Sequence, residues 1–382
     1  MFNFSPVTKK RLRAFRRNKR AWWSFLIFIG VFIFAMCADF VCPLSPVEVI
    51  DAKTLEKYRE KQIEEEHDVR TSRGILLDNG KLVRWEGPED VRESFLESLK
   101  KNGGDVQKVK LDEFDIRIKK SKSLLGTRVF LKELSPPKVK SRHETLSPVT
   151  WPFRPVPGHP FGIDSAGRDV YSRVVHGLRI ALLFGLALAF SGLLAGIVIG
   201  AIEGYFGGWT DILGQRFTEI WSAMPFLYVM IFVGATFDRG FGILLICYAL
   251  FNWIGVSYYV RAEFLRLRVR TFVEAAKCQG LSAVRIIFKH ILPNAITPLV
   301  TLFPFLLMGA IGSLAALDFL GFGLPPMTPS LGEILSQAQQ FRFAWWLVFF
   351  PGLALFVVML LVVLIGEGLR DAFDPRQRSV LE

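Results

Sequence analysis

The sequence is poor in cysteine and lacks the loop that binds nucleotide phosphates. Its 382 residues include only four cysteines, which are Cys37, Cys42, Cys247 and Cys278. None of them lies in the long polar segment after Cys42, so no disulfide framework is predicted. No segment reads Gly-x-x-x-x-Gly-Lys-Ser/Thr. We therefore expect a chain that does not hydrolyse ATP itself and holds no catalytic residues and no cofactor.

Long apolar runs without charge are what the sequence has instead. A stretch of about 18 or more such residues is long enough to span a bilayer. Six segments reach or approach this length: 21–41, 180–202, 220–237, 241–260, 296–317 and 343–366. The last five contain no Asp, Glu, Lys, Arg or His. The expected fold class is an all-α polytopic membrane protein with six transmembrane helices. Ion-coupled carriers commonly hold ionisable groups inside the bilayer, so any driving energy would come from a partner or be absent.

The net charge of +12 is unevenly distributed. Residues 1–20 carry eight Lys or Arg and no acid, and residues 261–293 carry seven Lys or Arg against Glu263 and Glu274. Basic residues in short loops stay on the cytoplasmic side of a membrane. We predict that both termini and the 261–293 loop are cytoplasmic in a bacterial inner membrane, and that the basicity reports topology, not nucleic-acid binding.

The polar segment 43–176 is too long to lack structure of its own. Residues 75–77 and 82–85 flank Asp78-Asn79-Gly80-Lys81, a sequence typical of a β-hairpin turn. We predict a small α+β extracytoplasmic insertion between helices 1 and 2 that ends in a proline-rich linker. The predicted domains are a cytoplasmic tail (1–20), the first transmembrane helix (21–42), the insertion and linker (43–176), a five-helix core (177–370) with a cytoplasmic loop (261–293), and a second tail (371–382).

The 261–293 loop has the signals of two short helices. Thr271 and Glu274 have the spacing of a capping box, in which Thr caps the helix and Glu reaches back. Gly280 suits a left-handed turn at the end of the first helix. A second helix is expected over 283–291, with Pro293 ending it. A well-capped loop needs no function, yet a long, cationic loop with small residues suits docking into a groove on another protein.

Several motifs in this part of the chain resemble one family. Glu274-Ala275-Ala276, Gly280 and Leu292-Pro293 resemble the EAA loop of importer permeases of the ATP-binding-cassette (ABC) superfamily, and His290-Ile291-Leu292-Pro293-Asn294 resembles its dipeptide/oligopeptide branch. Other stretches between His159 and Arg376 are similar to the same branch; they are His159–Asp164 with Gly167–Asp169, Gly204–Gly208 with Asp211, Asp318–Pro326 with Pro329–Gly332, and Leu369–Pro375. Many members of the branch have Glu at the position of Asp318 and Asp at the position of Glu367. In these two residues the chain resembles the microcin C/oligopeptide permease group. The insertion resembles nothing known to us.

The resemblance implies a mechanism and partners. In this family the EAA loop forms a coupling helix in a cleft of the ATPase, so the implied ATPase-coupling residues are Glu274, Ala275, Ala276, Gly280, His290 and Pro293. It also implies a second homologous permease subunit, two ATPase subunits that hydrolyse the ATP, and an extracytoplasmic solute-binding protein. The expected activity is translocation of peptides or peptide-like solutes by alternating access.

A glycine stripe marks the second apolar run. Its members recur every four residues, at Gly192, Gly196, Gly200 and Gly204. Small residues along one helix stripe allow helices to approach closely in lipid. We predict a helix-packing face, which could serve the chain's own helices or a second permease.

Two further sets of residues are candidates, one for metal binding and one for contact with the solute. His159, Asp164 and Asp169 have a spacing that fits no common metal site, so no metal is predicted and Asp164 is interpreted as a turn residue. Asn252, Trp253 and Tyr259 are candidates for contact with the solute, although packing is the simpler interpretation.

Two alternatives stay open at this point. One is a membrane-anchored assembly or structural protein whose extracytoplasmic part carries the function, and the other is an integral membrane enzyme. A structured cytoplasmic loop argues against the first, because an anchor does not need one.

Overall fold

The chain divides into two units, of which one combines Met1–Val49 with Trp151–Glu382 and the other is Ile50–Thr150. Each unit is described by itself. The computed structural model describes residues 6–50, 74–78, 81–86, 116–123, 126–133, 152–237 and 239–373, together with 94, 97, 98, 100 and 101.

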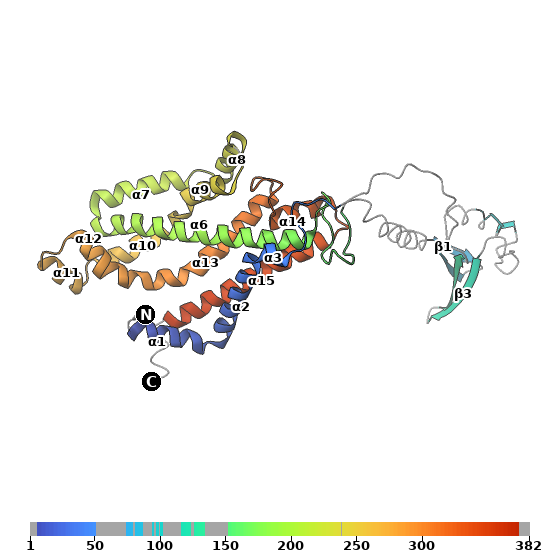
Figure 1. The fold of residues 1–382 in the computed structure, drawn as a ribbon, viewed down its shortest axis with the longest axis horizontal. Coiled ribbons are helices and arrows are strands. Elements are labelled where there is room, and N and C mark those ends of the chain that lie inside the picture. Colours follow the sequence, from blue (N-terminus) through green and yellow to red (C-terminus); the bar gives the residue numbers. More distant parts are fainter. Residues whose placement is uncertain are drawn as a thin grey trace. The chain divides into compact units, whose positions relative to one another are not determined.

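The first unit is mostly helical in its described part, with non-helical segments at 42–50 and 152–169 that form isolated β-bridges (Figure 1). Its N-terminal helices are α1 (Pro6–Arg17), α2 (Lys19–Met36) and α3 (Ala38–Val41). The longer series that follows is α6 (Val170–Phe206), α7 (Gly208–Ser222), α8 (Phe226–Thr236), α9 (Phe241–Asn252), α10 (Ile254–Leu267), α11 (Thr271–Cys278), α12 (Ala283–Ile286), the π-helix η3 (Ile287–Ile291), α13 (Leu292–Phe319), α14 (Leu331–Gln340) and α15 (Trp346–Phe373).

Five helical segments among the described residues are long and apolar enough to cross a membrane, or six if one bent pair counts as a span. The five are Lys19–Met36, Val170–Phe206, Phe241–Leu267, Pro298–Phe319 and Trp346–Phe373. The bent pair is α7 with α8, which meet at 67°. A mostly helical, multi-pass architecture is thereby confirmed.

The predicted continuous span over 220–237 is wrong. Helix α7 ends at Ser222 and α8 begins only at Phe226, with Pro225 at its N-cap. Proline disfavours helical geometry in the residue before it, and a prediction from hydropathy does not include this effect. The apolar run is therefore split between two helices.

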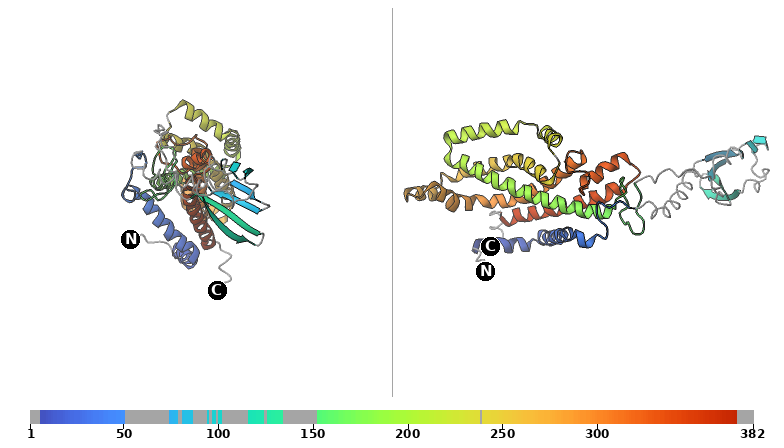
Figure 2. Two further views of the ribbon diagram at one scale, coloured as in Figure 1. Left: turned by 90° about the vertical axis from the view of Figure 1, so that its right-hand side faces the viewer. Right: turned by 45° about the horizontal axis from the view of Figure 1, so that its top comes forward.

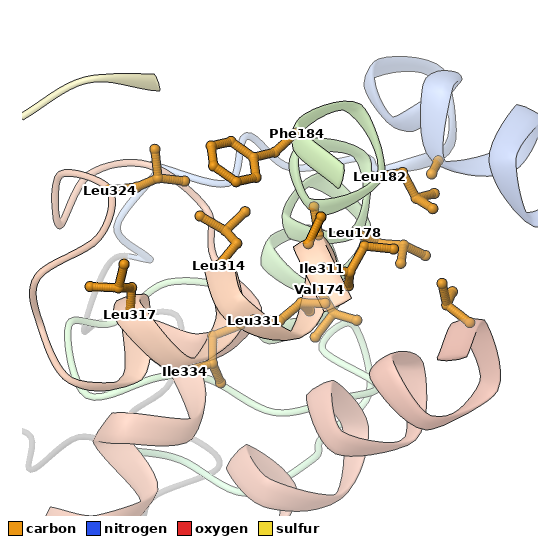
Figure 3. Packing of buried hydrophobic residues seen from close by; sticks show 14 of the residues in the cluster. Val174, Leu178, Leu182, Phe184, Ile311, Leu314, Leu317, Leu324, Leu331 and Ile334 are labelled. Atoms are coloured by element: carbon orange, nitrogen blue, oxygen red, sulfur yellow. The ribbon is translucent and has the colours of Figure 1, made fainter. Parts of the chain in front are cut away.

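Helix α6 lies at the centre of the unit and packs against α10, α13, α14 and α15 (Figures 1 and 2). Figure 3 shows part of the core, in which buried side chains of α6, α13 and α14 belong to one cluster; among those labelled are Leu178, Phe184, Ile311, Leu314, Leu331 and Ile334. Helices α11 and α12 lie at one end of this bundle, and α14 lies at the other (Figure 1).

The predicted glycine stripe lies on one face of α6, where Gly196, Gly200 and Gly204 face α10 and its start, and Gly192 faces Asn252 at the end of α9. A Cβ atom at Gly196 would lie 2.5 Å from Cβ of Val256, and one at Gly200 would lie 2.5 Å from the backbone oxygen of Ser257. Ordinary carbon contacts are about 3.5–4.0 Å, so only glycine allows this approach. The four glycines thus face helices of the same chain: Gly192, Gly196, Gly200 and Gly204.

The second unit contains a four-stranded sheet in the order β1-β2-β4-β3. Its strands are β1 (Gly74–Asp78), β2 (Lys81–Glu86), β3 (Ile116–Ser123) and β4 (Gly126–Glu133). The β1–β2 and β3–β4 pairs are antiparallel and β2–β4 is parallel. The β1–β2 pair lies at the position of the predicted hairpin, with Asp78 opposite Lys81. The overall α+β class and the extracytoplasmic location of the insertion stay predictions, since most of it is outside the described residues.

Candidate functional site

The loop between α10 and α13 is a compact helical hairpin. Helix α11 ends at Cys278, and Gly280, whose φ is +73°, follows two positions later. The Gly280 N–H donates to the Lys277 carbonyl at 2.9 Å and the Leu281 N–H donates to the Ala276 carbonyl at 3.3 Å. These two bonds form a Schellman motif, which satisfies the last carbonyls of the helix and needs a left-handed residue at this point. The prediction for Gly280 is confirmed by its backbone geometry.

Two other predictions for this loop are wrong. The N-cap of α11 is Arg270, without a side-chain cap hydrogen bond, so Thr271 is the first helical residue and the capping box is not formed. Pro293 does not end a helix: α12 passes through η3 directly into α13, and Pro293 lies in the first turn of α13. Proline has no N–H to donate, and here it stands just after the π-turn of η3, where the regular ladder of helical hydrogen bonds is already interrupted.

The loop is fixed to the bundle by buried apolar side chains. Val273 and Ala276 of α11 are fully buried and pack in one cluster with Ile286 of α12 and Ile291 of η3. Phe264 of α10 belongs to the same cluster, so the hairpin rests on the helix that precedes it. A force applied to the loop would therefore be passed to α10 and α13.

Other side chains of the loop point outward, and no described residue covers them. Val284 is 65% exposed and Phe288 is 63% exposed. Phe272, Glu274 and Ala275 are exposed as well. Together these five residues are called the loop surface. Exposed apolar side chains of this size, outside the membrane-crossing segments, are typical of a surface that another protein covers.

The predicted coupling residues divide between these two environments. Ala276 is buried and Gly280 shapes the turn, whereas Glu274 and Ala275 are exposed. His290 lies in the π-helix, where its carbonyl accepts a hydrogen bond from Asn294 Nδ2 at 2.7 Å. π-Helical turns are frequent at functional sites because they break the regular ladder of hydrogen bonds.

A charged clasp connects α10 to α7. The Arg261 guanidinium binds both carboxylate oxygens of Asp211, with Nη2 at 2.8 Å from Oδ2. Both side chains are mostly buried, and such a bidentate pair fixes distance as well as orientation. Beside it, the buried Glu203 of α6 accepts a hydrogen bond from Gln215 Nε2 at 2.8 Å. The clasp thereby joins the helix that enters the loop to the start of the bent pair.

At the opposite end of the bundle, two arginines and two carboxylates form a buried network. Arg168 Nε donates to Asp164 Oδ2 at 2.9 Å, and its Nη2 lies 3.2 Å from Glu333 Oε1. The fully buried Arg173 pairs with Glu333 and lies 3.5 Å from Asp164. Gln337 Nε2 donates to Glu333 at 2.7 Å. This charge network (Asp164, Arg168, Arg173 and Glu333) ties the segment before α6 to α14.

The candidate metal ligands His159, Asp164 and Asp169 lie in the same region. Asp164 Oδ1 accepts from the N–H groups of Ala166 and Arg168, both at 2.9 Å, as an Asx turn does. His159 Nδ1 lies 2.9 Å from Asp169 Oδ1. The interpretation of Asp164 as a turn residue is confirmed.

An ion pair also joins α3 to this end of α6. Arg179 Nη1 donates to Asp39 Oδ2 at 2.7 Å, and His176 Nε2 lies 3.2 Å from the other carboxylate oxygen. The hydrogen bond from Arg179, followed by that from His176, lowers the pKa of the Asp39 carboxyl. Asp39 therefore stays ionised beside its partners.

Two of the three residues proposed to contact the solute use their polar side-chain atoms within the helical bundle. Asn252 Nδ2 donates to the Leu188 carbonyl at 3.0 Å, and the buried Trp253 donates from Nε1 to the Leu250 carbonyl at 2.8 Å. Tyr259 is 38% exposed. The packing interpretation holds for the first two residues.

Sequence reasoning missed the clasp and the charge network. From the sequence, Asp164 is interpreted only as a turn residue, and Arg168 and Asp211 appear only within motifs. Their partners Arg261, Arg173 and Glu333 carry no signal of their own in those motifs. A usable signal was present: Arg173 and Arg179 lie in the first turns of a helix whose middle is apolar, and a cation that is buried there requires a carboxylate partner.

Comparison with known proteins identifies the family. Residues 192–379 match the model of the binding-protein-dependent transport system inner membrane component, and residues 8–57 match the N-terminal transmembrane domain of oligopeptide transport permease C. The chain is 35% identical to the peptidoglycan transport system permease protein YejE of Agrobacterium fabrum, over 98% of this chain and 94% of that protein. It is 33% identical to the inner membrane ABC transporter permease protein YejE of Escherichia coli, over 99% of each chain. It is also 39% identical to the dipeptide transport system permease protein DppC of Alkalihalophilus pseudofirmus, over 58% of this chain and 73% of that protein.

The chain is also similar to a solved structure, the MetNI methionine ABC transporter in an inward-facing conformation. The match covers 55% of this chain and 96% of that chain, with 18% identity and a TM-score of 0.42. This likeness is too low to carry a structural argument. The sequence matches that cover almost the whole chain are sufficient to assign the family. This chain belongs to the family of binding-protein-dependent transport system inner membrane components, the multi-pass permease subunits of ABC transporters. The predicted resemblance is confirmed, and the anchor and enzyme alternatives have no support. Membership of the microcin C/oligopeptide group stays a prediction.

Proposed function

We propose that this chain is the permease subunit of an ABC importer that translocates peptides or peptide-like solutes across the inner membrane. The observation that carries the proposal is the 35% identity over 98% of the chain to a transport permease. The names of the relatives refer to peptidoglycan, dipeptide, oligopeptide and glutathione transport, which supports a solute built from amide-linked amino acids.

The ATPase-coupling role is assigned to the loop between α10 and α13. In this proposal Glu274 and Ala275, with the apolar members of the loop surface, contact the ATPase directly. Ala276 and Gly280 give the hairpin its shape, because one is buried beneath it and the other forms its turn. His290 and Pro293 lie where the loop becomes α13, so they are placed to pass the movement on.

The clasp then gives the movement a second route. A loop displaced by the ATPase moves α10, and Arg261 carries Asp211 and the start of α7 with it. The glycine stripe keeps α6 and α10 in contact during this movement, since their backbones already touch. Helices α6, α7 and α10 would thus shift as one body, which is what alternating access requires.

The topology and partners follow from this assignment. With the loop facing the ATPase, both termini are cytoplasmic, and the insertion within 43–176 is extracytoplasmic with an α+β fold. The domain boundaries remain those predicted from the sequence. The partners are a second homologous permease, two ATPase subunits that bind and hydrolyse the ATP, and a solute-binding protein; lipid surrounds the helices.

Reconstitution tests this function. The chain is co-expressed with the permease, ATPase and binding-protein subunits of its own transport system and placed in proteoliposomes. We expect ATP-dependent uptake of labelled di- to pentapeptides or muropeptides and none of free sugars. Uptake of sugars but no peptide would contradict the solute class, and uptake by the isolated chain without ATPases would contradict the driven mechanism.

A further inference from the structure

The N-terminal helix α1 presents a basic face that nothing in the described chain covers. Arg13, Arg16 and Arg17 follow the i, i+3, i+4 spacing that places side chains on one face of a helix. All three side chains are exposed, and so are Lys19 and Arg20 at the start of α2. Five cations therefore gather within eight residues.

The other face of α1 is fixed to the bundle. Phe15 is buried against Ala21 and Ala372, and its ring meets that of Phe25 edge-on at 6.0 Å. The Arg11 guanidinium lies 4.6 Å from the centre of the Phe373 ring. These contacts with α2 and α15 hold the helix in one orientation, so the basic face is held outward.

No carboxylate neutralises the five cations among the described residues. Arg16 lies over the Trp22 ring at 4.7 Å, which leaves its charge in place. Helix α15, on which α1 packs, carries two acidic side chains near its end: Asp371 accepts a hydrogen bond from Asn18 Nδ2 at 3.3 Å, and Glu367 is exposed. Neither of them forms an ion pair with a described side chain of α1 or α2.

The position of α1 in the chain brings this face to the bilayer surface. Asn18 separates α1 from α2, whose Lys19–Met36 segment is apolar enough to span the membrane. Trp22 and Trp23 stand at the beginning of that segment, and Trp23 is 62% exposed, as in the aromatic belt at a membrane interface. The cations thus lie beside the level where the lipid headgroups begin.

We propose that α1 lies on the bilayer surface and that Arg13, Arg16, Arg17, Lys19 and Arg20 bind the headgroups of anionic phospholipids. Clustered cations next to a span are attracted to an anionic leaflet, and a helix with one apolar and one basic face is suited to lie in the interface. Because α1 packs on both the first and the last transmembrane helices, the bound lipids hold these two helices together at that surface.

Site-resolved hydrogen exchange tests the proposal on the full-length protein. The chain is placed in nanodiscs of phosphatidylcholine alone or with phosphatidylglycerol, and amide exchange is followed in α1. We expect exchange in α1 to be about fivefold slower with phosphatidylglycerol, and this difference to shrink in high salt. Peptides from α11 serve as the internal reference and should not respond.

Matched triple variants decide the outcome. Arg13, Arg16 and Arg17 changed to Gln should remove the lipid-dependent protection, whereas the same three changed to Lys should keep it. Unaltered exchange in α2 and α15 shows that each variant is folded. Equal protection in both lipids, or protection retained in the Gln variant, would overturn the proposal. Protection that appears only when ATPase subunits are added, whatever the lipid, would assign the face to a protein partner and overturn it too.

Discussion

Replacing Gly200 by alanine should force α6 and α10 apart. The new Cβ atom would lie 2.5 Å from the Ser257 carbonyl oxygen, 2.9 Å from the Arg261 backbone nitrogen and 2.9 Å from Cβ of Val260. Two of these atoms belong to the backbone of α10 and cannot rotate away. The helices must therefore separate by about 1 Å along the contact to restore ordinary distances.

The magnitude follows from two opposing effects. Overpacking of a close contact costs about 1–3 kcal/mol. Alanine in place of glycine inside a helix offsets this by about 1 kcal/mol. The expected net loss is about 0–2 kcal/mol, which lowers Tm by up to roughly 3 °C in a protein of this size. Gly196→Ala should behave alike, but the double variant should lose less than the sum, because a single separation of the two helices relieves both clashes.

The assay is the thermal loss of monodisperse protein in detergent, with Gly30→Ala in α2 as control. Nothing lies within 4 Å of a Cβ atom at Gly30, so that variant should be as stable as the parent or slightly more so. Gly200→Ala as stable as Gly30→Ala would refute the close approach of α6 and α10. Strict additivity of Gly196→Ala and Gly200→Ala would refute the shared displacement.

Three further predictions concern the charged contacts and the loop surface. Asp211→Asn should weaken the clasp by about 1–3 kcal/mol and lower the peptides moved per ATP hydrolysed; an unchanged ratio in proteoliposomes would show that the clasp does not transmit movement. Glu333→Gln should cost about 1.5–3 kcal/mol, because it removes the carboxylate that is hydrogen-bonded to Arg173 and leaves this buried cation only Asp164, at 3.5 Å, whereas Glu219→Gln at an exposed pair should stay within about 0.5 kcal/mol in the same thermal assay; equal effects would contradict the buried network. Phe288→Ser should leave Tm unchanged, because the side chain is 63% exposed, but should weaken association with the ATPase subunits in co-purification. Undiminished association would show that Phe288 of the loop surface does not contact the ATPase.

Local patterns predicted the membrane helices, the hairpin position and the Gly280 turn. The apolar runs predict spans because burial of the backbone in lipid demands helices of a fixed length. Gly280 is predictable because only a left-handed residue closes a Schellman motif. Pro293 is ambiguous for the opposite reason: the same residue is compatible with the end of one helix and the first turn of the next.

Long-range contacts were beyond such patterns. Arg173 and Glu333 are separated by 160 positions, and no periodicity connects them. The break between α7 and α8 depends on Pro225 within a run whose composition is otherwise continuous. The glycine spacing predicts a packing face, but the choice between a helix of this chain and one of a partner depends on the fold.

Coupling between the loop and the ATPase is tested most directly at Gly280. Proline cannot adopt its φ of +73°, whereas asparagine tolerates the left-handed region, and a Cβ atom there meets nothing within 4 Å. The measurement is ATP-driven peptide uptake by proteoliposomes that contain the complete transporter with Gly280→Pro or Gly280→Asn. We predict that the proline variant inserts into the membrane but drives no uptake, and that the asparagine variant retains it. Normal uptake by the proline variant would contradict the role of this loop.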